Sequence, residues 1–338
     1  MSRPSPSEEP PAATFTPFER HFSEHGARLP PFELEPVPMT LARTTARGAL
    51  LTLLACLLSA GAASASASAK VPTLVFPVLG ATTYTDDFGD PRGQGGHEGN
   101  DIMAPKRALA LAAEAGTVKF WTTSARAGCM LYLEGESGTE YLYVHLNNDL
   151  TLENDNQGQC VPGVAYAPGL QDGAKVLAGE PIAFVGDSGD ANGIHAHLHF
   201  EVHPNGGGAV SPYPHLRKAR QLLFAARSGT TFTLALTGTL LAAAGQNVSL
   251  DLEQVRSWPG GRRIKQTGRK VAVSIPETAS IEGITGAPEV AGYSALELLT
   301  KGLPVTIWTA PAKVTLAAQS GARGSLSASR VVVKTLKN

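Results

Sequence analysis

The sequence predicts an all-β protein: an antiparallel, sandwich-like or barrel-like domain followed by a second, smaller β-barrel or sandwich. From residue 71 onward, short apolar stretches alternate with Gly, Asn and Asp, as in chains of many short strands. The chain holds 36 Gly and 24 Pro but only 6% aromatic residues, which also favours turns. Strands alternating with long helices, the pattern of parallel sheets, are absent. With 338 residues, 43% of them hydrophobic, the chain can form two domains with a sizeable core.

The first 69 residues are expected to precede the folded part. Residues 1–38 are Pro-rich and lack periodicity, so they are a disordered tail or, as we favour, precede the true start at Met39. Residues 39–69 have the features of a signal peptide: Arg43 and Arg47, an apolar run over 48–60, and Ala-Ser repeats. That run is short for a stable membrane span. We therefore expect a protein that is secreted, periplasmic or associated with the cell wall; lipidation at Cys56 is a weaker alternative.

Export makes the cysteines informative. Cys129 and Cys160 are the only two that remain after residue 69, and in an oxidising compartment they are expected to form a disulfide. The bond would hold the polar segment 147–169. Two buried free thiols are the alternative. Neither cysteine has another Cys or His at chelating spacing, so both are poor metal ligands.

The first domain is expected over residues 71–227. One short helix is predicted at 214–226, before Ser228 and Gly229. The predicted strands are 74–76, 116–121, 130–134, 140–146, 175–176, 181–185 and a histidine-rich strand that ends at 203.

The second domain, residues 230–338, has a different composition and no predicted role. It contains no histidine, and its predicted strands are 231–236, 248–252, 270–275, 303–308, 313–317 and 330–334. Its basic residues favour a solvated hairpin, with binding of an anionic wall polymer as the weaker alternative. The net charge of -1 gives no indication of a nucleic-acid partner. The residues considered for the polymer are Arg262, Arg263, Arg269 and Lys270.

The histidine-rich strand is the central feature of the sequence. Within Gly193–His203, Ala196, Leu198, Phe200 and Val202 alternate with four of the nine histidines and one glutamate. Alternation of this kind predicts a half-buried strand with one apolar face. Imidazole is the commonest metal ligand among side chains, so the polar face is a candidate metal site. The residues of that face are His195, His197, His199, Glu201 and His203.

Three more features precede that strand. His97 and Asp101 form an HxxxD in a Gly-rich loop, where Gly99 would let the two side chains converge. His145 ends the strand-like Tyr-Leu-Tyr-Val-His. The segment 173–189 alternates Gly-rich turns with short strands. In isolation, each is as well explained by chance or by a structural role.

Together and in this order, these features resemble the lysostaphin-type (LytM-like) zinc metallopeptidases, which cut peptidoglycan peptides. The resemblance covers about 140 residues and implies the family's duplicated hybrid motif. It further implies that His97, Asp101 and His199 bind one Zn²⁺ and that His145 and His197 form the catalytic pair. Two imidazoles and one carboxylate that leave a position open are typical of catalytic zinc sites, whereas structural sites have four protein ligands.

The chain departs from the family pattern at two places that bear on substrate preference. Arg107 and Leu109 stand where the family has Gly and Pro, and the segment 190–196 replaces a Ser-Thr-Gly-Pro. The extra His195 is expected to line the cleft or support it. Glu201 is expected to orient a ligand, with a plain surface role nearly as well supported.

The leading hypothesis is a secreted zinc endopeptidase acting on peptidoglycan stem or cross-bridge peptides. One alternative is an inactive wall-binding module that regulates another hydrolase. Such members typically lose zinc ligands, and this chain keeps all three. Another is a structural module whose zinc only stabilises the fold; zinc removal would then unfold the domain before it affected any activity.

Overall fold

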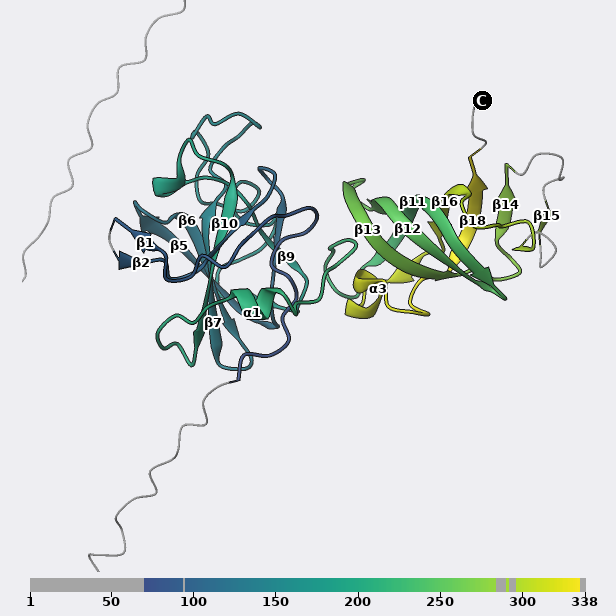
Figure 1. Ribbon diagram of the computed structural model, residues 1–338. Helices are drawn as coiled ribbons and strands as arrows, with labels where there is room; N and C mark the ends of the chain where they lie inside the picture. The colour runs from purple at the N-terminus through teal and green to yellow at the C-terminus, as the bar shows by residue number, and fades with distance from the viewer. Residues whose placement is uncertain (1–69, 94, 284–289, 292–295, 335–338) are drawn as a thin grey trace, which may run out of the picture. The chain divides into compact units, whose positions relative to one another are not determined.

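The computed structural model describes residues 70–93, 95–283, 290–291 and 296–334 (Figure 1). The predicted tail 1–38 and signal peptide 39–69 lie outside the described residues. The described chain is almost entirely β, as the sequence predicts, and its sheets are open. Within the described part of the chain, no helix has the length and apolarity that a membrane crossing requires. The division into domains at 71–227 and 230–338 stays a prediction.

A six-stranded antiparallel sheet carries the candidate site. Its order is β3-β10-β7-β6-β5-β8, which brings the HxxxD segment, the histidine-rich strand and the strand of His145 side by side. Two strand pairs, β1–β2 and β4–β9, lie outside this sheet. The bounds are β1 Pro91–Arg92, β2 Gly95–Gly96, β3 Asn100–Met103, β4 Leu109–Leu111, β5 Gly116–Ser124, β6 Gly128–Gly135, β7 Thr139–Leu146, β8 Lys175–Val176, β9 Pro181–Phe184 and β10 His197–Pro204.

The core of this part includes residues of the six-stranded sheet and of the β4–β9 pair, in the manner of a sandwich. Leu198, Phe200 and Val202 of β10 are fully buried in it, so the predicted apolar face is confirmed. The buried Tyr143 hydroxyl donates to the Leu111 carbonyl at 2.9 Å and accepts from a backbone N–H at 2.8 Å. Its polar group is thereby satisfied inside the core.

The helix predicted at 214–226 is wrong in extent. Within the predicted range, the helix is limited to α1, Tyr213–Leu216. A separate 3-10 turn, η1, spans Gly189–Ala191. Arg220 instead exchanges backbone hydrogen bonds with the predicted first strand, donating to Leu74 and accepting from Phe76. Three consecutive residues then become buried, which an amphipathic helix could not achieve with one apolar face. These residues are Leu222, Leu223 and Phe224.

The second half forms an open sheet in the order β13-β12-β11-β16-β18-β14-β15, with β17 paired to β11. Its first three strands are about twice as long as predicted. The strand predicted at 313–317 is wrong beyond Lys313, because Thr315 caps a short helix by accepting from the Ala318 N–H. The bounds are β11 Thr231–Ala244, β12 Asn247–Trp258, β13 Arg263–Ser274, β14 Ser280–Glu282, β15 Val290–Ala291, β16 Pro304–Thr309, β17 Ala312–Lys313, α3 Leu316–Ser320 and β18 Ala328–Val333.

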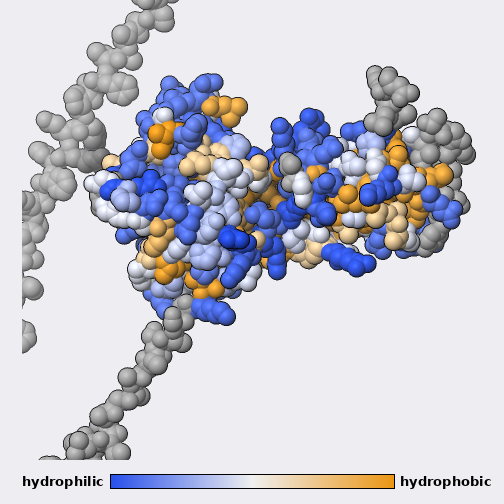
Figure 2. Space-filling model, in the orientation of Figure 1, coloured by the Kyte–Doolittle hydropathy of each residue, from blue (hydrophilic) through white to orange (hydrophobic). Residues whose placement is uncertain are grey.

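The face shown in Figure 2 is mostly hydrophilic, with hydrophobic residues in separate patches.

The basic residues considered for an anionic polymer lie in and beside the β12–β13 hairpin, and they do not all offer free charges. Arg269 donates to the carbonyls of Gln221 at 2.6 Å and Ser320 at 2.9 Å. Its burial lowers the pKa of the guanidinium, as burial does for Arg262. The structure therefore does not support the hypothesis that these residues bind an anionic polymer.

The long segment 147–169 is anchored at several points. Cys129 and Cys160 form the predicted disulfide. The Lys106 ammonium lies 2.8 Å from the buried Asp149 carboxylate, and Arg107 donates to the Leu150 carbonyl at 3.1 Å. Arg107 has a φ of 61°, a left-handed conformation that favours the glycine found there in the resembling family.

We expect the disulfide to contribute to stability mainly by restricting the unfolded chain. A bond between residues 31 apart stabilises a fold by about 3–4 kcal/mol in the chain-entropy description. Urea unfolding of Cys129→Ser/Cys160→Ser against the oxidised protein measures this loss. Two free thiols in the oxidised protein, seen by intact mass, would contradict the bond.

Candidate metal centre

Two of the three proposed ligands are cross-strand neighbours. In the register of β3 and β10, Asp101 stands directly opposite His199. Side chains directly opposite on one face of antiparallel strands have Cβ atoms about 4.5–5.5 Å apart. The flanking Ile102 and Phe200 are fully buried on the other face, which turns Asp101 and His199 away from the core. The carboxylate and the imidazole therefore meet because of strand pairing alone.

The third ligand comes from the loop before β3. His97 directly follows the β1–β2 hairpin. Its position is fixed because the backbone N–H of His97 donates to the Asp90 carbonyl, at the start of the hairpin, at 2.9 Å. Gly99 allows the loop to pass close to β10: a Cβ there would lie 2.7 Å from the Phe200 carbonyl oxygen and 2.8 Å from His199 Nε2. Glycine is needed at position 99 because any side chain would collide with β10. The sequence had suggested a different reason, the freedom of a glycine backbone to fold the loop.

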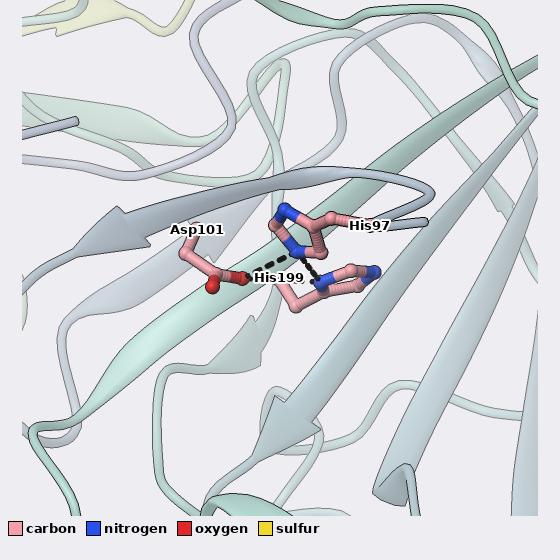
Figure 3. A group of neighbouring side chains, drawn as sticks. All are labelled: His97, Asp101 and His199. Carbon is pink, nitrogen blue, oxygen red and sulfur yellow. Dashed lines mark hydrogen bonds and ion pairs between the residues drawn. The ribbon is translucent and has the colours of Figure 1, made fainter. Parts of the chain in front are cut away.

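The three side chains converge on one point (Figure 3). His97 Nε2 lies 2.8 Å from His199 Nδ1, and each nitrogen lies 3.1 Å from Asp101 Oδ1. Donor atoms of a tetrahedral zinc site with bonds of about 2.0–2.1 Å are about 3.3 Å apart. An ion would thus need the donors to separate by only a few tenths of an ångström.

Hydrogen bonds of the outer ring nitrogens hold the two imidazoles so that His97 Nε2 and His199 Nδ1 face this point. His97 Nδ1 donates to the Asp87 carbonyl at 2.9 Å, and His199 Nε2 donates to Glu201 Oε1 at 2.9 Å. Each ring proton is therefore directed outward in the tautomers that these bonds favour. With a cation bound, these tautomers would turn two imidazole lone pairs and a carboxylate oxygen toward it. The donor set fits Zn²⁺.

Asp101 and Glu201 are held ionised. Burial raises the pKa of Asp101, but hydrogen bonds from His199 and His97 outweigh it and keep that pKa well below its usual range. Burial also raises the pKa of Glu201, but hydrogen bonds with His199 and His203 outweigh it and lower that pKa to about 2. For His199, burial lowers the pKa, and hydrogen bonds with Asp101 and Glu201 raise it to about 9, so a metal ion would have to displace the Nδ1 proton of this ring. Ionised carboxylates at neutral pH are what a metal site requires.

His145 reaches the site through a β-bulge. Tyr141 and Tyr143 of β7 point into the core, so strict alternation would bury His145 with them. The pairing of β6 with β7 shifts at this position, setting Val144 and His145 against a single residue of β6. His145 has a φ of 59°, a conformation uncommon outside glycine and concentrated at functional sites. Leu146 returns to the core, and His145 lines the cavity.

His145 and His197 face each other beside the three converging side chains. Their ring centroids are 5.1 Å apart. His145 Nδ1 donates to the Ser188 carbonyl and His197 Nδ1 to the His195 carbonyl, both at 2.9 Å, so each Nε2 is left without its proton. Burial, with the nearby His197, lowers the pKa of His145 to about 4. A neutral imidazole with a free Nε2 can accept a proton.

The five residues line one cavity of about 600 Å³, together with Glu201, Arg92 and Arg126. Its lining includes no residue of the segment 147–169. The side chain of His195 is exposed and lines a neighbouring hollow beside Lys106, so the structure does not group it with the other imidazoles. Only its backbone carbonyl supports the site.

The sequence did not reveal two residues that contact the site. Asp87 bonds His97 through its carbonyl, and its Oδ1 accepts from the buried Asn100 amide at 2.5 Å. Arg92 Nη2 donates to Asp101 Oδ2 at 2.9 Å. Both residues precede the HxxxD in the sequence, and the β1–β2 hairpin folds their segment back against it. Strands of only two residues leave little pattern in a sequence, so this hairpin was not predicted. A cluster of charged residues just before a metal-ligand motif is the one indication available.

Glu201→Gln is expected to weaken zinc binding by about 10–100-fold, because the amide no longer holds the His199 ring by an ionic hydrogen bond. Competition with a chromogenic chelator measures the change. His203→Gln is the matched control: it removes only the outer partner of Glu201, 2.6 Å away, and should weaken binding less. Equal losses in both variants would argue against the proposed role of Glu201.

The chain is similar over part of its length to solved structures of peptidases. No protein-family model matches it, and no curated protein matches it. A protein assigned as a glycyl-glycine endopeptidase, lytM, from Ruminococcus gnavus is 26% identical, with a TM-score of 0.35; the match covers 45% of this chain and 62% of that one. The catalytic domain of lysostaphin from Staphylococcus simulans is 22% identical, with a TM-score of 0.32 and coverage of 40% and 92%.

A zinc-containing peptidase from Vibrio cholerae is also 22% identical, with a TM-score of 0.30 over 41% of this chain and 39% of that one. The matches thus span less than half of this chain, and only 62% of the Ruminococcus protein. Because these TM-scores lie below 0.5, the side chains of the site, and not the overall likeness, indicate what this chain can do.

Proposed function

We propose that the chain is a zinc metalloendopeptidase of the lysostaphin type that hydrolyses peptide bonds of bacterial peptidoglycan. The observation that carries this proposal is the convergence of His97, Asp101 and His199, with ring protons directed outward, beside a second pair of imidazoles. The three converging residues would hold the ion. Bound Zn²⁺ supplies Lewis acidity, which polarises a carbonyl and lowers the pKa of water.

The remaining residues bind, orient and move protons. His145 and His197 present unprotonated Nε2 atoms to the cavity, so one can accept a proton from the attacking water and pass it to the leaving amine. The other, after taking a proton from solvent, can hydrogen-bond the carbonyl oxygen as negative charge develops there. Ser188 and the His195 carbonyl hold the two rings in these orientations. Glu201 and Asp87 do the same for the ligand rings.

An inactive regulatory module is the second candidate, and the geometry disfavours it. A module that only binds wall peptides has no need of two further oriented imidazoles beside a complete ligand set. The strained backbone of His145 gives the same indication, because such conformations persist where function needs them. The disulfide supports action outside the cytoplasm, in the periplasm or at the cell wall.

Digestion of purified peptidoglycan tests the proposal. The mature protein with one equivalent of zinc should release peptides with new amino and carboxyl ends, identified by mass, and a chelator should stop their release. Circular dichroism under the same chelation should show a folded protein. Intact peptidoglycan with zinc-loaded protein would refute the enzyme, and unfolding on chelation would indicate a structural zinc site.

A further inference from the structure

Arg92 has a position that the proposed chemistry does not use. It lies in β1 and lines the same cavity as the three proposed ligands. Its side chain is 45% exposed although its Nη2 donates to Asp101 Oδ2 at 2.9 Å and lies 3.5 Å from Asp87 Oδ2. Within the described residues, the contacts of this guanidinium all involve Nη2. Nε and Nη1 therefore remain for a ligand.

Arg92 differs from the other arginine of the cavity in its contact with a proposed ligand. Its Nη2 donates to Asp101 Oδ2 at 2.9 Å, which places the guanidinium beside the point where the three side chains converge. Glu201 is bound to His199 and His203, and Glu98 lines the cavity as an exposed residue. Arg126, the other arginine of the cavity, has its Nε 3.8 Å from Asp190 and contacts none of the three proposed ligands. Arg92 is therefore the arginine placed to hold an anion next to the metal site.

We propose that Arg92 binds a carboxylate of the peptide substrate next to the scissile bond, which makes the enzyme selective for acidic peptides. This inference rests on the proposed peptidase function. A guanidinium presents its N–H groups in a planar fork that matches a carboxylate, and its contact with Asp101 holds that fork in place. Asp101 Oδ1 faces His97 Nε2 and His199 Nδ1, and Oδ2 faces Arg92, so the bound carboxylate belongs to a residue adjoining the cleaved bond.

The carboxylate can come from an acidic side chain or from a free chain end. Two pairs of peptides that span the bond identified in digested peptidoglycan separate these sources. One pair carries Glu or Gln beside the scissile bond, and the other ends in a free acid or an amide. A charge-assisted hydrogen bond predicts that kcat/KM is about 10- to 150-fold higher for the acidic member of at least one pair.

Variants assign the preference to Arg92. In Arg92→Gln, the ratio of kcat/KM for the acidic peptide to kcat/KM for the neutral peptide should fall to near one. The missing contact with Asp101 would lower kcat/KM for both peptides alike and leave this ratio unchanged. Arg92→Lys should retain part of the ratio. Arg126→Gln, the matched control, removes the other cavity arginine and should keep the ratio. Calorimetric binding of the same peptides to chelated protein gives a second readout and should show the same order.

The outcomes separate the two proposals. A wild-type enzyme that cleaves acidic and neutral peptides equally well would overturn the role of Arg92 and leave the peptidase intact. A preference lost in Arg126→Gln and kept in Arg92→Gln would also overturn it. If the wild-type enzyme cleaves no peptide or peptidoglycan at all, the peptidase proposal itself fails.

Discussion

Replacing His199 by alanine is expected to empty the metal site and abolish hydrolysis. His199 supplies one of three protein donors, and its Nδ1 lies within 3.1 Å of both of the others. A zinc site with four ligands is worth about 10–16 kcal/mol, or about 2.5–4 kcal/mol per ligand. Losing one should therefore weaken zinc binding by about 100–1,000-fold. Metal content after dialysis, measured by inductively coupled plasma mass spectrometry, reports the loss.

The same result is expected for His97→Ala and Asp101→Ala. His203→Ala is the matched control because it removes an imidazole from the same strand and the same face, where it contacts Glu201 and no ligand atom of the site. It should retain one zinc per chain. Stoichiometric zinc in any of the three ligand variants would show that the residue is not a ligand.

Replacing His145 or His197 by alanine should separate catalysis from metal binding. Each variant should keep its zinc, because neither imidazole belongs to the converging group. Each should lower kcat by about 10²–10⁴-fold, the usual contribution of a positioned acid or base. Rates come from release of a peptide that spans the identified bond, and zinc content is measured on the same samples.

His195→Ala provides the comparison. The His195 side chain is exposed and lines a different hollow, and only its backbone carbonyl bonds His197. We expect a change in kcat of less than about threefold, the size of a surface substitution. A loss as large as that of His197→Ala would give the His195 side chain a part in catalysis, against the cleft or supporting role expected from the sequence. Unchanged rates in His145→Ala would remove His145 from the mechanism.

The sequence predicts the part of the site that depends on strand alternation. The period of two in residues 196–203 places His197 and His199 opposite the apolar core, and the structure has them there. The position of His145 could not be predicted in the same way. Alternation along β7 would place it in the core with Tyr143, and only the bulge turns it toward the cavity. Such a shift depends on the partner strand.

The contacts around the ligands escaped prediction for a similar reason. Asp87 and Arg92 reach His97 and Asp101 because a hairpin of two-residue strands folds back over the loop. The helix predicted at 214–226 failed because tertiary pairing of Arg220 with the segment at Leu74 outweighed local propensity. Interactions within one strand could be inferred, whereas those between segments required the fold.

The most direct measurement of the central claim is the position of zinc in a crystal of the loaded protein. An anomalous difference map at the zinc edge should show one peak about 2.0–2.1 Å from His97 Nε2, His199 Nδ1 and a carboxylate oxygen of Asp101. It should lie in the cavity that His145 and His197 line. A peak bound elsewhere, or no peak at this site in active protein, would contradict the account.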